Sequence, residues 1–282
     1  MKKLKINAFA DEANPGIDIQ IKALKRNGLD GIEIRNADGE NVSDISTEKA
    51  AEIKNKFDAE GLEIFSLGSP IGKINADEDF EPHLEKFRRT LETANILGAK
   101  NIRVFSFYIP KGCEAASFRN EVIDRLGQMC SLAKESGIDI CHENEKGIYG
   151  DTPARCLEIF SALPDMRGIF DPANFVQCGE DTIRAWAMLK PYIKYLHIKD
   201  SLTDGRVVPA GMGNGNIPAI LSEYIALGGK SVTLEPHLAV FDGLSALERE
   251  GEESAVGGMN YKSNEEAFDA ACKALKKILE DI

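Results

Sequence analysis

The sequence contains no apolar run that approaches the roughly 20 residues needed to span a bilayer. The basic start, Met1-Lys2-Lys3, leads into charged and polar residues instead of the apolar core of a signal peptide. The six cysteines form no CxxC pair and no zinc-knuckle spacing, so we expect reduced thiols. These absences predict a cytoplasmic protein without a membrane span.

Basic residues are in deficit, with 34 Lys and Arg against 46 Asp and Glu, a net charge of −12. This balance argues against nonspecific binding of nucleic acid and against an anionic membrane surface. The hydrophobic fraction of 43% and the charged fraction of 28% are typical of a folded domain. Composition therefore predicts a globular protein with no nucleic-acid or membrane partner, and it leaves the oligomeric state open, a homo-oligomer included.

Eight apolar runs of strand length alternate with longer stretches of helical pattern. The expected strands are Lys5–Phe9, Gly31–Arg35, Glu63–Leu67, Asn101–Phe105, Asp139–Glu143, Arg167–Asp171, Tyr195–Lys199 and Ser231–Glu235. The expected helices are Ile17–Asn27, Thr47–Glu60, Phe80–Leu97, Phe118–Ser136, Pro153–Ala162, Thr182–Leu189, Ile217–Leu227 and Glu265–Asp281. Eight strand-then-helix units predict a parallel sheet closed into a (β/α)₈ TIM barrel.

No linker rich in proline, glycine or serine divides the chain, so we expect a single α/β domain over residues 1–282. Two longer stretches, Ser201–Asn216 and Ala239–Asn264, follow the seventh and eighth strands. Loops after barrel strands lie at the catalytic face, so each is a candidate lid. The alternative is that both are simply long surface loops.

Side chains alternate in direction along a strand, so one face of several strands is polar. His197 and Lys199 share such a face in the seventh strand, Arg103 lies on it in the fourth, and Glu33 in the second. Charges inside a barrel cost several kcal/mol unless they are paired or bind a metal. The structural alternative is an internal network of ion pairs, for instance between Glu33 and Arg103, and the functional one is a site that uses these charges.

Four consecutive strands end in groups that can bind a metal, namely Glu143, Asp171, His197 and Glu235. Three carboxylates and an imidazole suit Mn²⁺ or Mg²⁺, and they are also compatible with Co²⁺ or Zn²⁺. Each residue comes from a different strand, so their meeting depends on the barrel. For His197 alone, the alternative is a core histidine bonded to Asp200 or to a backbone carbonyl.

Several segments in this order carry a resemblance to a known family. They are Phe9-Ala10-Asp11-Glu12, the stretch from Glu143-Asn144 to Asp151-Thr152, Asp171-Pro172-Ala173-Asn174-Phe175, His197-Ile198-Lys199-Asp200 and Leu234-Glu235-Pro236-His237. From about Ile6 to Leu238 the chain resembles the sugar phosphate isomerase/epimerase family. This family belongs to the xylose-isomerase-like TIM barrel superfamily, with endonuclease IV, ketose 3-epimerases, hydroxypyruvate isomerase and inosose dehydratase.

The resemblance implies that the four residues bind one divalent metal and that Arg103 and Lys199 contact the substrate. Two departures keep the substrate class open. Glu145 stands where many relatives carry a histidine, and Gly211-Met212-Gly213 stands where many have Gly-Glu-Gly.

Such a site suits removal of a proton beside a carbonyl, with the metal polarising the carbonyl and stabilising an enediolate. We expect Glu143 and Glu235 to be the catalytic acid and base, because two strands separate them and they can flank a ligand held in the middle. Arg103 and Lys199 would orient hydroxyls or a phosphate. Their structural alternatives are ion pairs, of Arg103 with Glu33 and of Lys199 with Asp200 or Glu235.

Further expected pocket residues are Ser69, Glu145 and His237, although a structural role for His237 is equally consistent with the sequence. His83 and His142 are expected to be structural.

The favoured function is a metal-dependent isomerase or epimerase of a small sugar, sugar phosphate or polyol. A dehydratase or lyase with the same metal site is the nearest alternative. A nuclease similar to endonuclease IV fits poorly with four histidines and the negative charge, and a non-catalytic sugar-binding barrel is the remaining alternative.

Overall fold

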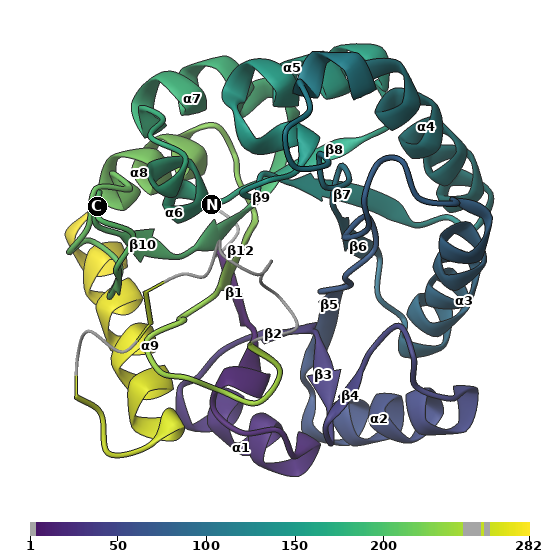
Figure 1. Ribbon diagram of the computed structural model, residues 1–282. Coiled ribbons are helices and arrows are strands. Elements are labelled where there is room, and N and C mark those ends of the chain that lie inside the picture. Colours follow the sequence, from purple (N-terminus) through teal and green to yellow (C-terminus); the bar gives the residue numbers. More distant parts are fainter. Residues whose placement is uncertain (1–3, 245–254, 257–259) are drawn as a thin grey trace.

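The computed structural model describes residues 4–244, 255–256 and 260–282. In these residues eight parallel strands close a barrel in the order β1-β12-β9-β8-β7-β6-β5-β2, which confirms the predicted TIM barrel (Figure 1). The barrel strands are β1 (Lys5–Ala8), β2 (Gly31–Ile34), β5 (Glu63–Leu67), β6 (Asn101–Val104), β7 (Asp139–Glu143), β8 (Arg167–Phe170), β9 (Ile193–Ile198) and β12 (Ser231–Leu234).

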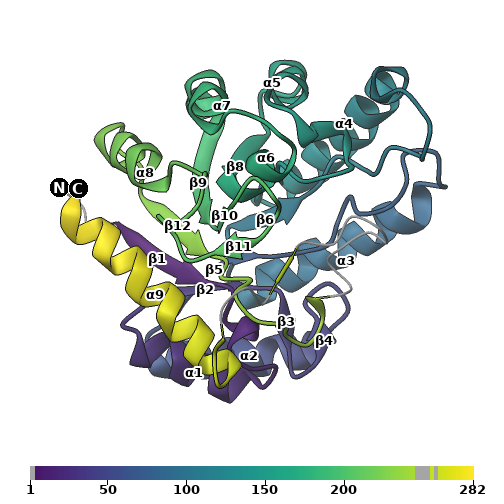
Figure 2. The same cartoon turned by 60° about the vertical axis from the view of Figure 1, so that its left-hand side comes forward.

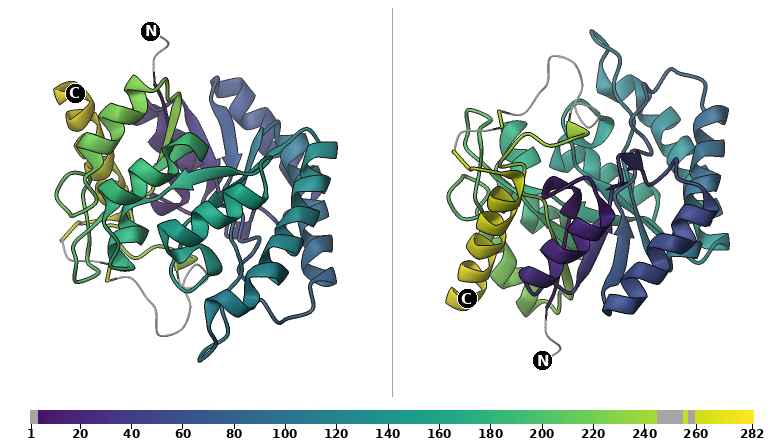
Figure 3. Two further views of the ribbon diagram at one scale, coloured as in Figure 1. Left: turned by 90° about the horizontal axis from the view of Figure 1, so that it is seen from above. Right: turned by 90° about the horizontal axis from the view of Figure 1, so that it is seen from below.

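Helices surround the strands, and the side views of Figure 3 show them on the outer face of the barrel. The α-helices are α1 (Ile17–Arg26), α2 (Thr47–Glu60), α3 (Glu81–Leu97), α4 (Arg119–Glu135), α5 (Pro153–Ala162), α6 (Pro172–Gln177), α7 (Thr182–Leu189), α8 (Ile217–Ala226) and α9 (Asn264–Asp281). Short 3₁₀ turns are η1 (Ala10–Glu12), η2 (Ala115–Phe118), η3 (Tyr149–Asp151) and η4 (Lys190–Tyr192). Among the described helices, none is long and apolar enough to cross a membrane.

Three features differ from the sequence expectations. A short helix, α6, begins directly after β8, because Asp171 caps it and Pro172 is its first residue. The stretch 201–216 contains part of a small hairpin, in which β10 (Asp200–Ser201) pairs with β11 (Val207–Val208). A second hairpin, β3 (Asn36–Ala37) with β4 (Glu40–Asn41), follows β2. Residues 245–254 and 257–259 of the other candidate lid, Ala239–Asn264, lie outside the described residues.

The alternation of strand side chains separates an apolar outer layer from a polar interior. In β9, Leu196 and Ile198 join the large apolar core between strands and helices. Tyr195 faces the other way and packs with Phe65 in a small cluster. His197, also on that face, is completely buried. The same alternation in the other strands gathers polar residues inside the barrel, beside the ends of the strands.

Helix α9 lies alongside α1 and completes the ring of helices (Figure 2). Arg26 of α1 forms ion pairs with Glu265 and Asp269 of α9. The N-terminus of α9 is capped by Ser263, whose hydroxyl accepts the Glu266 backbone N–H. All six cysteines are free, as expected.

Candidate metal centre and active site

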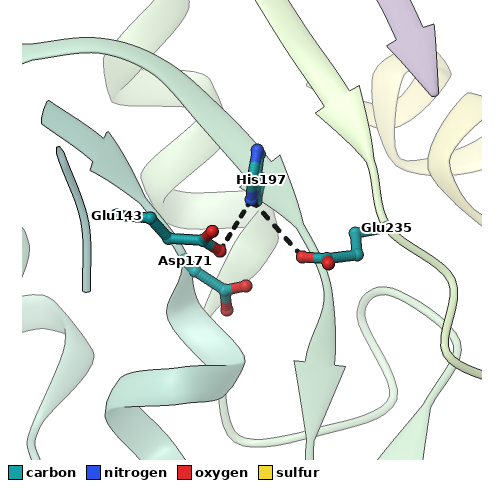
Figure 4. A group of neighbouring side chains, drawn as sticks. All are labelled: Glu143, Asp171, His197 and Glu235. Carbon is teal, nitrogen blue, oxygen red and sulfur yellow. Dashed lines mark hydrogen bonds and ion pairs between the residues drawn. The ribbon is translucent and has the colours of Figure 1, made fainter. Parts of the chain in front are cut away.

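Four buried side chains converge at one end of the barrel: Glu143, Asp171, His197 and Glu235 (Figure 4). Each offers one ligand atom, and these atoms all lie within 4.8 Å of one another. His197 lies between the two glutamates, with Nδ1 2.8 Å from Glu143 Oε1 and 3.3 Å from Glu235 Oε2. The barrel thus brings together the four residues that the sequence selected as candidate ligands.

Two asparagines hold the loops that carry Glu143 and Asp171 together. Asn144 donates through Nδ2 to the Asp171 carbonyl at 2.9 Å and accepts the Asp171 backbone N–H through Oδ1 at 3.0 Å. Asn174 donates through Nδ2 to the Asn144 carbonyl at 2.8 Å. The Asp171 carboxylate accepts the Asn174 backbone N–H, so it caps α6 and its orientation is fixed. These contacts explain why Asn144 follows Glu143 and Asn174 lies three residues after Asp171.

The orientation of His197 depends on Glu33, whose carboxylate Oε2 lies 3.2 Å from Nε2. Tyr195 donates its hydroxyl to Glu33 Oε1 at 2.9 Å. The alternative that His197 is bonded to Asp200 or to a backbone carbonyl is wrong. Burial alone would lower the pKa of His197, but Glu143 and Glu33 raise it well above its usual value.

Arg103 donates through Nη1 to Glu143 Oε2 at 3.2 Å and through Nη2 to the Gly68 carbonyl at 3.1 Å. The alternative of an Arg103–Glu33 ion pair is therefore wrong, because the Arg103 guanidinium contacts Glu143 and the Gly68 carbonyl, and Glu33 is engaged by His197 and Tyr195.

The Lys199 ammonium lies 2.8 Å from Asp171 Oδ2 and 3.2 Å from Glu235 Oε2. Glu235 is one of the two ion-pair partners that the sequence suggested for Lys199. The other, Asp200, instead accepts backbone N–H groups from the loop after β9.

The sequence interpretation did not assign a role to Arg35, the largest fully buried side chain. Its guanidinium forms a two-point contact with Asp11, with Nε and Nη2 2.8 and 3.0 Å from the two carboxylate oxygens. It also approaches Glu12 at 3.3 Å and Glu235 at 3.4 Å. The sequence did contain a signal for a buried Arg35, because Arg35 shares the polar face of its strand with Glu33. Its partners Asp11 and Glu12 could not be predicted, because they lie in a turn after the first strand and strand alternation does not predict where turn side chains point.

The remaining expected pocket residues differ in their surroundings. His237 donates its backbone N–H to Glu12, and its Nε2 lies 3.4 Å from Glu12 Oε1 and 3.5 Å from Glu235 Oε1. Glu145 pairs with Lys73. The Ser69 hydroxyl donates to the Arg103 carbonyl at 2.6 Å, so it supports the backbone beside the site. His83 and His142 lie away from the cluster, with Gly72 N–H and Ser106 as hydrogen-bond partners.

Asp200 anchors the glycine-rich loop after β9. Its carboxylate accepts backbone N–H groups from Ser201, Gly211, Gly213 and Gly215, at 2.9 to 3.0 Å. A Cβ atom on Gly213 would lie 2.3 Å from Asp200 Oδ1, so the loop can approach the carboxylate only because it lacks side chains there. The glycines therefore serve a structural purpose that the sequence did not reveal.

The donor set fits a divalent cation. The buried carboxylates at this end outnumber the buried Lys and Arg side chains: Asp11, Glu12, Glu33, Glu143, Asp171 and Glu235 against Arg35, Arg103 and Lys199. Burial raises the pKa of Asp171 to about 7, and Glu235 and Glu143 add to this, which shows how unfavourable another negative charge is there. With Nε2 directed at Glu33, Nδ1 of His197 faces the carboxylates, as expected for a metal-binding imidazole.

Solved structures of three other proteins share this fold along their full length. The IolI protein with a bound zinc atom matches with a TM-score of 0.76 and 18% identity, covering 99% of each chain. The probable 3-DHS dehydratase AsbF of Bacillus anthracis matches with 0.74 and 20%, covering 97% of this chain and 99% of that one. D-allulose 3-epimerase of Methylomonas sp., in complex with D-allulose, matches with 0.73 and 16%, covering 100% and 98%.

No curated protein sequence matches the chain. The family model described as xylose isomerase-like TIM barrel matches residues 21–278. That span includes all four residues of the cluster and seven of the eight barrel strands. The chain therefore belongs to the xylose isomerase-like TIM barrel family.

Proposed function

We propose that the protein is a divalent-metal-dependent isomerase or epimerase that moves a carbon-bound proton of a small sugar or polyol substrate. The observation that carries this proposal is the placement of Glu143 and Glu235 on two sides of His197, with Asp171 beside them (Figure 4). The relatives of known activity show only that this fold carries out such reactions.

Glu143 and Glu235 would hold the cation with Asp171 and His197, and they would also exchange the proton. A bound divalent cation would polarise the substrate carbonyl and offset the charge of an enediolate. Each glutamate is adjacent to a cation, Glu143 to Arg103 and Glu235 to Lys199. Both cations can also donate hydrogen bonds to substrate hydroxyls.

The two glutamates come from β7 and from the end of β12, which β8 and β9 separate in the barrel. A substrate held between them would present opposite faces of its reacting carbon. Removal of the proton by one glutamate and its return by the other would give epimerisation. Transfer between neighbouring carbons by one glutamate would give isomerisation.

The test is incubation of the enzyme and Mn²⁺ in D₂O with a panel of ketoses and ketose phosphates. Enzyme-dependent deuterium on the carbon beside the carbonyl supports the proposal. Glu143→Gln and Glu235→Gln should each abolish this exchange, with metal content measured in the same samples because both residues are also candidate ligands. Glu63→Gln is the matched control, since this exposed residue pairs with Lys5 at the start of its strand.

A sugar that binds at the cluster but takes up no deuterium and gives no product would contradict the proposal. Loss of water from the substrate would identify a dehydratase instead.

A further inference from the structure

A second pair of opposite charges, Lys73 and Glu145, lies beside the four-residue cluster. Lys73 Nζ is 3.4 Å from Glu145 Oε2, and their side chains are only 7% and 17% exposed. Lys73 follows β5 and its ammonium lies 4.5 Å from the centre of the Phe105 ring. Glu145 follows β7, two residues after Glu143. The pair is therefore built into the loops at the end of the barrel that carries the site.

Glu145 forms its ion pair with Lys73 two residues after the candidate ligand Glu143. Its carboxylate interacts electrostatically first with Lys73 and then with Lys199, and the latter also contacts Asp171 and Glu235. Its Oε1 accepts the Lys146 backbone N–H at 2.9 Å, which fixes the side chain. Without the Glu145 charge, the Lys73 ammonium would attract a phosphate or carboxylate group. Glu145 supplies a negative charge at that position.

The balance of the other charges around the cluster also disfavours binding of an anionic substrate. Among the described residues, each of its cations has its own carboxylate: Arg35 with Asp11, Arg103 with Glu143, Lys73 with Glu145, and Lys199 with Asp171. Two buried carboxylates, Glu33 and Glu235, remain beyond these pairs, whereas burial raises the pKa of Glu12 to about 8 and keeps it largely protonated at neutral pH. A divalent cation would offset these two charges, so even the metal-loaded site has no excess positive charge for an anionic substrate.

We propose that the Lys73–Glu145 pair makes this site selective for an uncharged polyhydroxy ketone over the corresponding phosphate ester. This inference rests on the proposed function and narrows its substrate class. The ammonium and carboxylate of the pair hydrogen-bond hydroxyl groups at the end of the substrate remote from the reacting carbon. The negative charge of Glu145 repels a phosphate placed there, and the net charge of −12 acts in the same direction at long range.

The first experiment measures the binding of inorganic phosphate by calorimetry, with and without Mn²⁺, because this probe does not depend on knowing the sugar. Glu145→Gln keeps the size of the side chain and its acceptor for Lys146 N–H, but removes the charge. We expect it to bind phosphate on the order of tenfold more tightly than the wild type, because a negative charge beside the phosphate-binding ammonium is removed in a partly screened site.

Two variants make this result specific. In the double variant Lys73→Met with Glu145→Gln, affinity for phosphate should return to the wild-type value, because the cation that binds phosphate is lost. Glu60→Gln removes the same charge from the exposed Lys25–Glu60 pair on the surface and should leave phosphate affinity unchanged. Equal phosphate affinity in the wild type and Glu145→Gln would overturn the inference.

The second experiment compares kcat/KM for matched pairs, such as D-fructose and its 6-phosphate or D-allulose and its 6-phosphate, with deuterium incorporation as the readout. The wild type should favour the free ketose in each active pair, and Glu145→Gln should reduce that preference. A wild-type preference for the phosphate ester would overturn the inference while leaving the proposed reaction intact. Absence of exchange with every sugar would contradict the proposed reaction, and the phosphate-binding comparison would still decide the charge selectivity.

Discussion

Glu33 and His197 meet across the inside of the barrel, with 3.2 Å between Glu33 Oε2 and His197 Nε2. Their strands, β2 and β9, are not neighbours in the sheet, because β1 and β12 lie between them. When a metal ion is bound at the cluster, the neutral tautomer with its proton on Nε2 would donate to Glu33 and leave Nδ1, which faces Glu143, free to coordinate the ion. This is the arrangement that fixes the ring of a metal-binding histidine.

Glu33→Gln should therefore weaken metal binding by roughly 10- to 100-fold, because the amide holds the imidazole less firmly and makes it less basic. The measurement is competition for Mn²⁺ or Zn²⁺ against a chelating indicator. Tyr195→Phe is the control, since it removes the hydroxyl that donates to Glu33 and keeps the Glu33–His197 contact. Unchanged metal affinity in Glu33→Gln would show that Glu33 does not orient the ligand.

The sequence predicted the barrel and the four-residue cluster, because both follow from local patterns. Alternating apolar residues identify the strands, and the residues at the strand ends must share one rim of a parallel barrel. It did not predict which polar residues meet across the interior. That choice depends on the tilt and stagger of the strands, and on irregularities such as the register shift between Ile32 and Glu33. The alternation of the strands therefore allowed an ion pair of Arg103 with Glu33 as an alternative, whereas the partner of Arg103 in the structure is Glu143.

Asp200→Asn should destabilise the fold and loosen the loop 201–216. The carboxylate accepts four backbone N–H groups, whereas an amide would direct its NH₂ group at some of the same donors. We expect a loss of about 3 kcal/mol in the free energy of unfolding. Chemical denaturation measures this loss, and hydrogen exchange should rise in residues 201–216. Asp204→Asn, an exposed change in the same loop, should have little effect on either quantity.

Two glycine-to-alanine substitutions should change stability in opposite directions. In Gly213→Ala the new Cβ would lie 2.3 Å from Asp200 Oδ1 and 2.6 Å from the Ser201 carbonyl oxygen, so the loop must move. In Gly127→Ala the Cβ meets only Leu163 Cδ2, at 3.6 Å, inside α4. Gly127→Ala should stabilise the protein by about 0.5 to 1 kcal/mol through helix propensity. A Gly213→Ala variant as stable as the wild type would argue against close packing of this loop on Asp200.

His83 should make the protein sensitive to mild acid. Burial lowers its pKa to about 4, with Lys86 and Arg125 contributing, and its Nε2 accepts the Gly72 backbone N–H at 2.8 Å. The folded state keeps His83 neutral while the unfolded chain protonates it near pH 6.5, so this contribution is complete above pH 6.5 and is lost as pH falls toward 4. Between pH 7 and 4.5, the wild type should lose about 2 kcal/mol more than His83→Gln, which keeps an acceptor that does not titrate. Equal losses, measured by urea denaturation at the two pH values, would contradict this assignment.

A divalent cation should stabilise the folded chain through the four-residue cluster. A ligand that binds only the folded state adds about 2.7 kcal/mol to stability at a hundred times its dissociation constant. Thermal unfolding of chelator-treated protein should therefore shift to higher temperature on addition of Mn²⁺ or Zn²⁺. The shift should shrink in Asp171→Asn, because its side chain has lost the negative charge that the cation requires while it can still cap α6 through its carbonyl oxygen. Asp165→Asn serves as the control, since its carboxylate contacts Lys134 on the surface and should leave the shift unchanged. An equal metal-dependent shift in Asp171→Asn and the wild type would exclude Asp171 as a ligand, and the absence of a shift with either ion in the wild type would argue against a metal site of useful affinity.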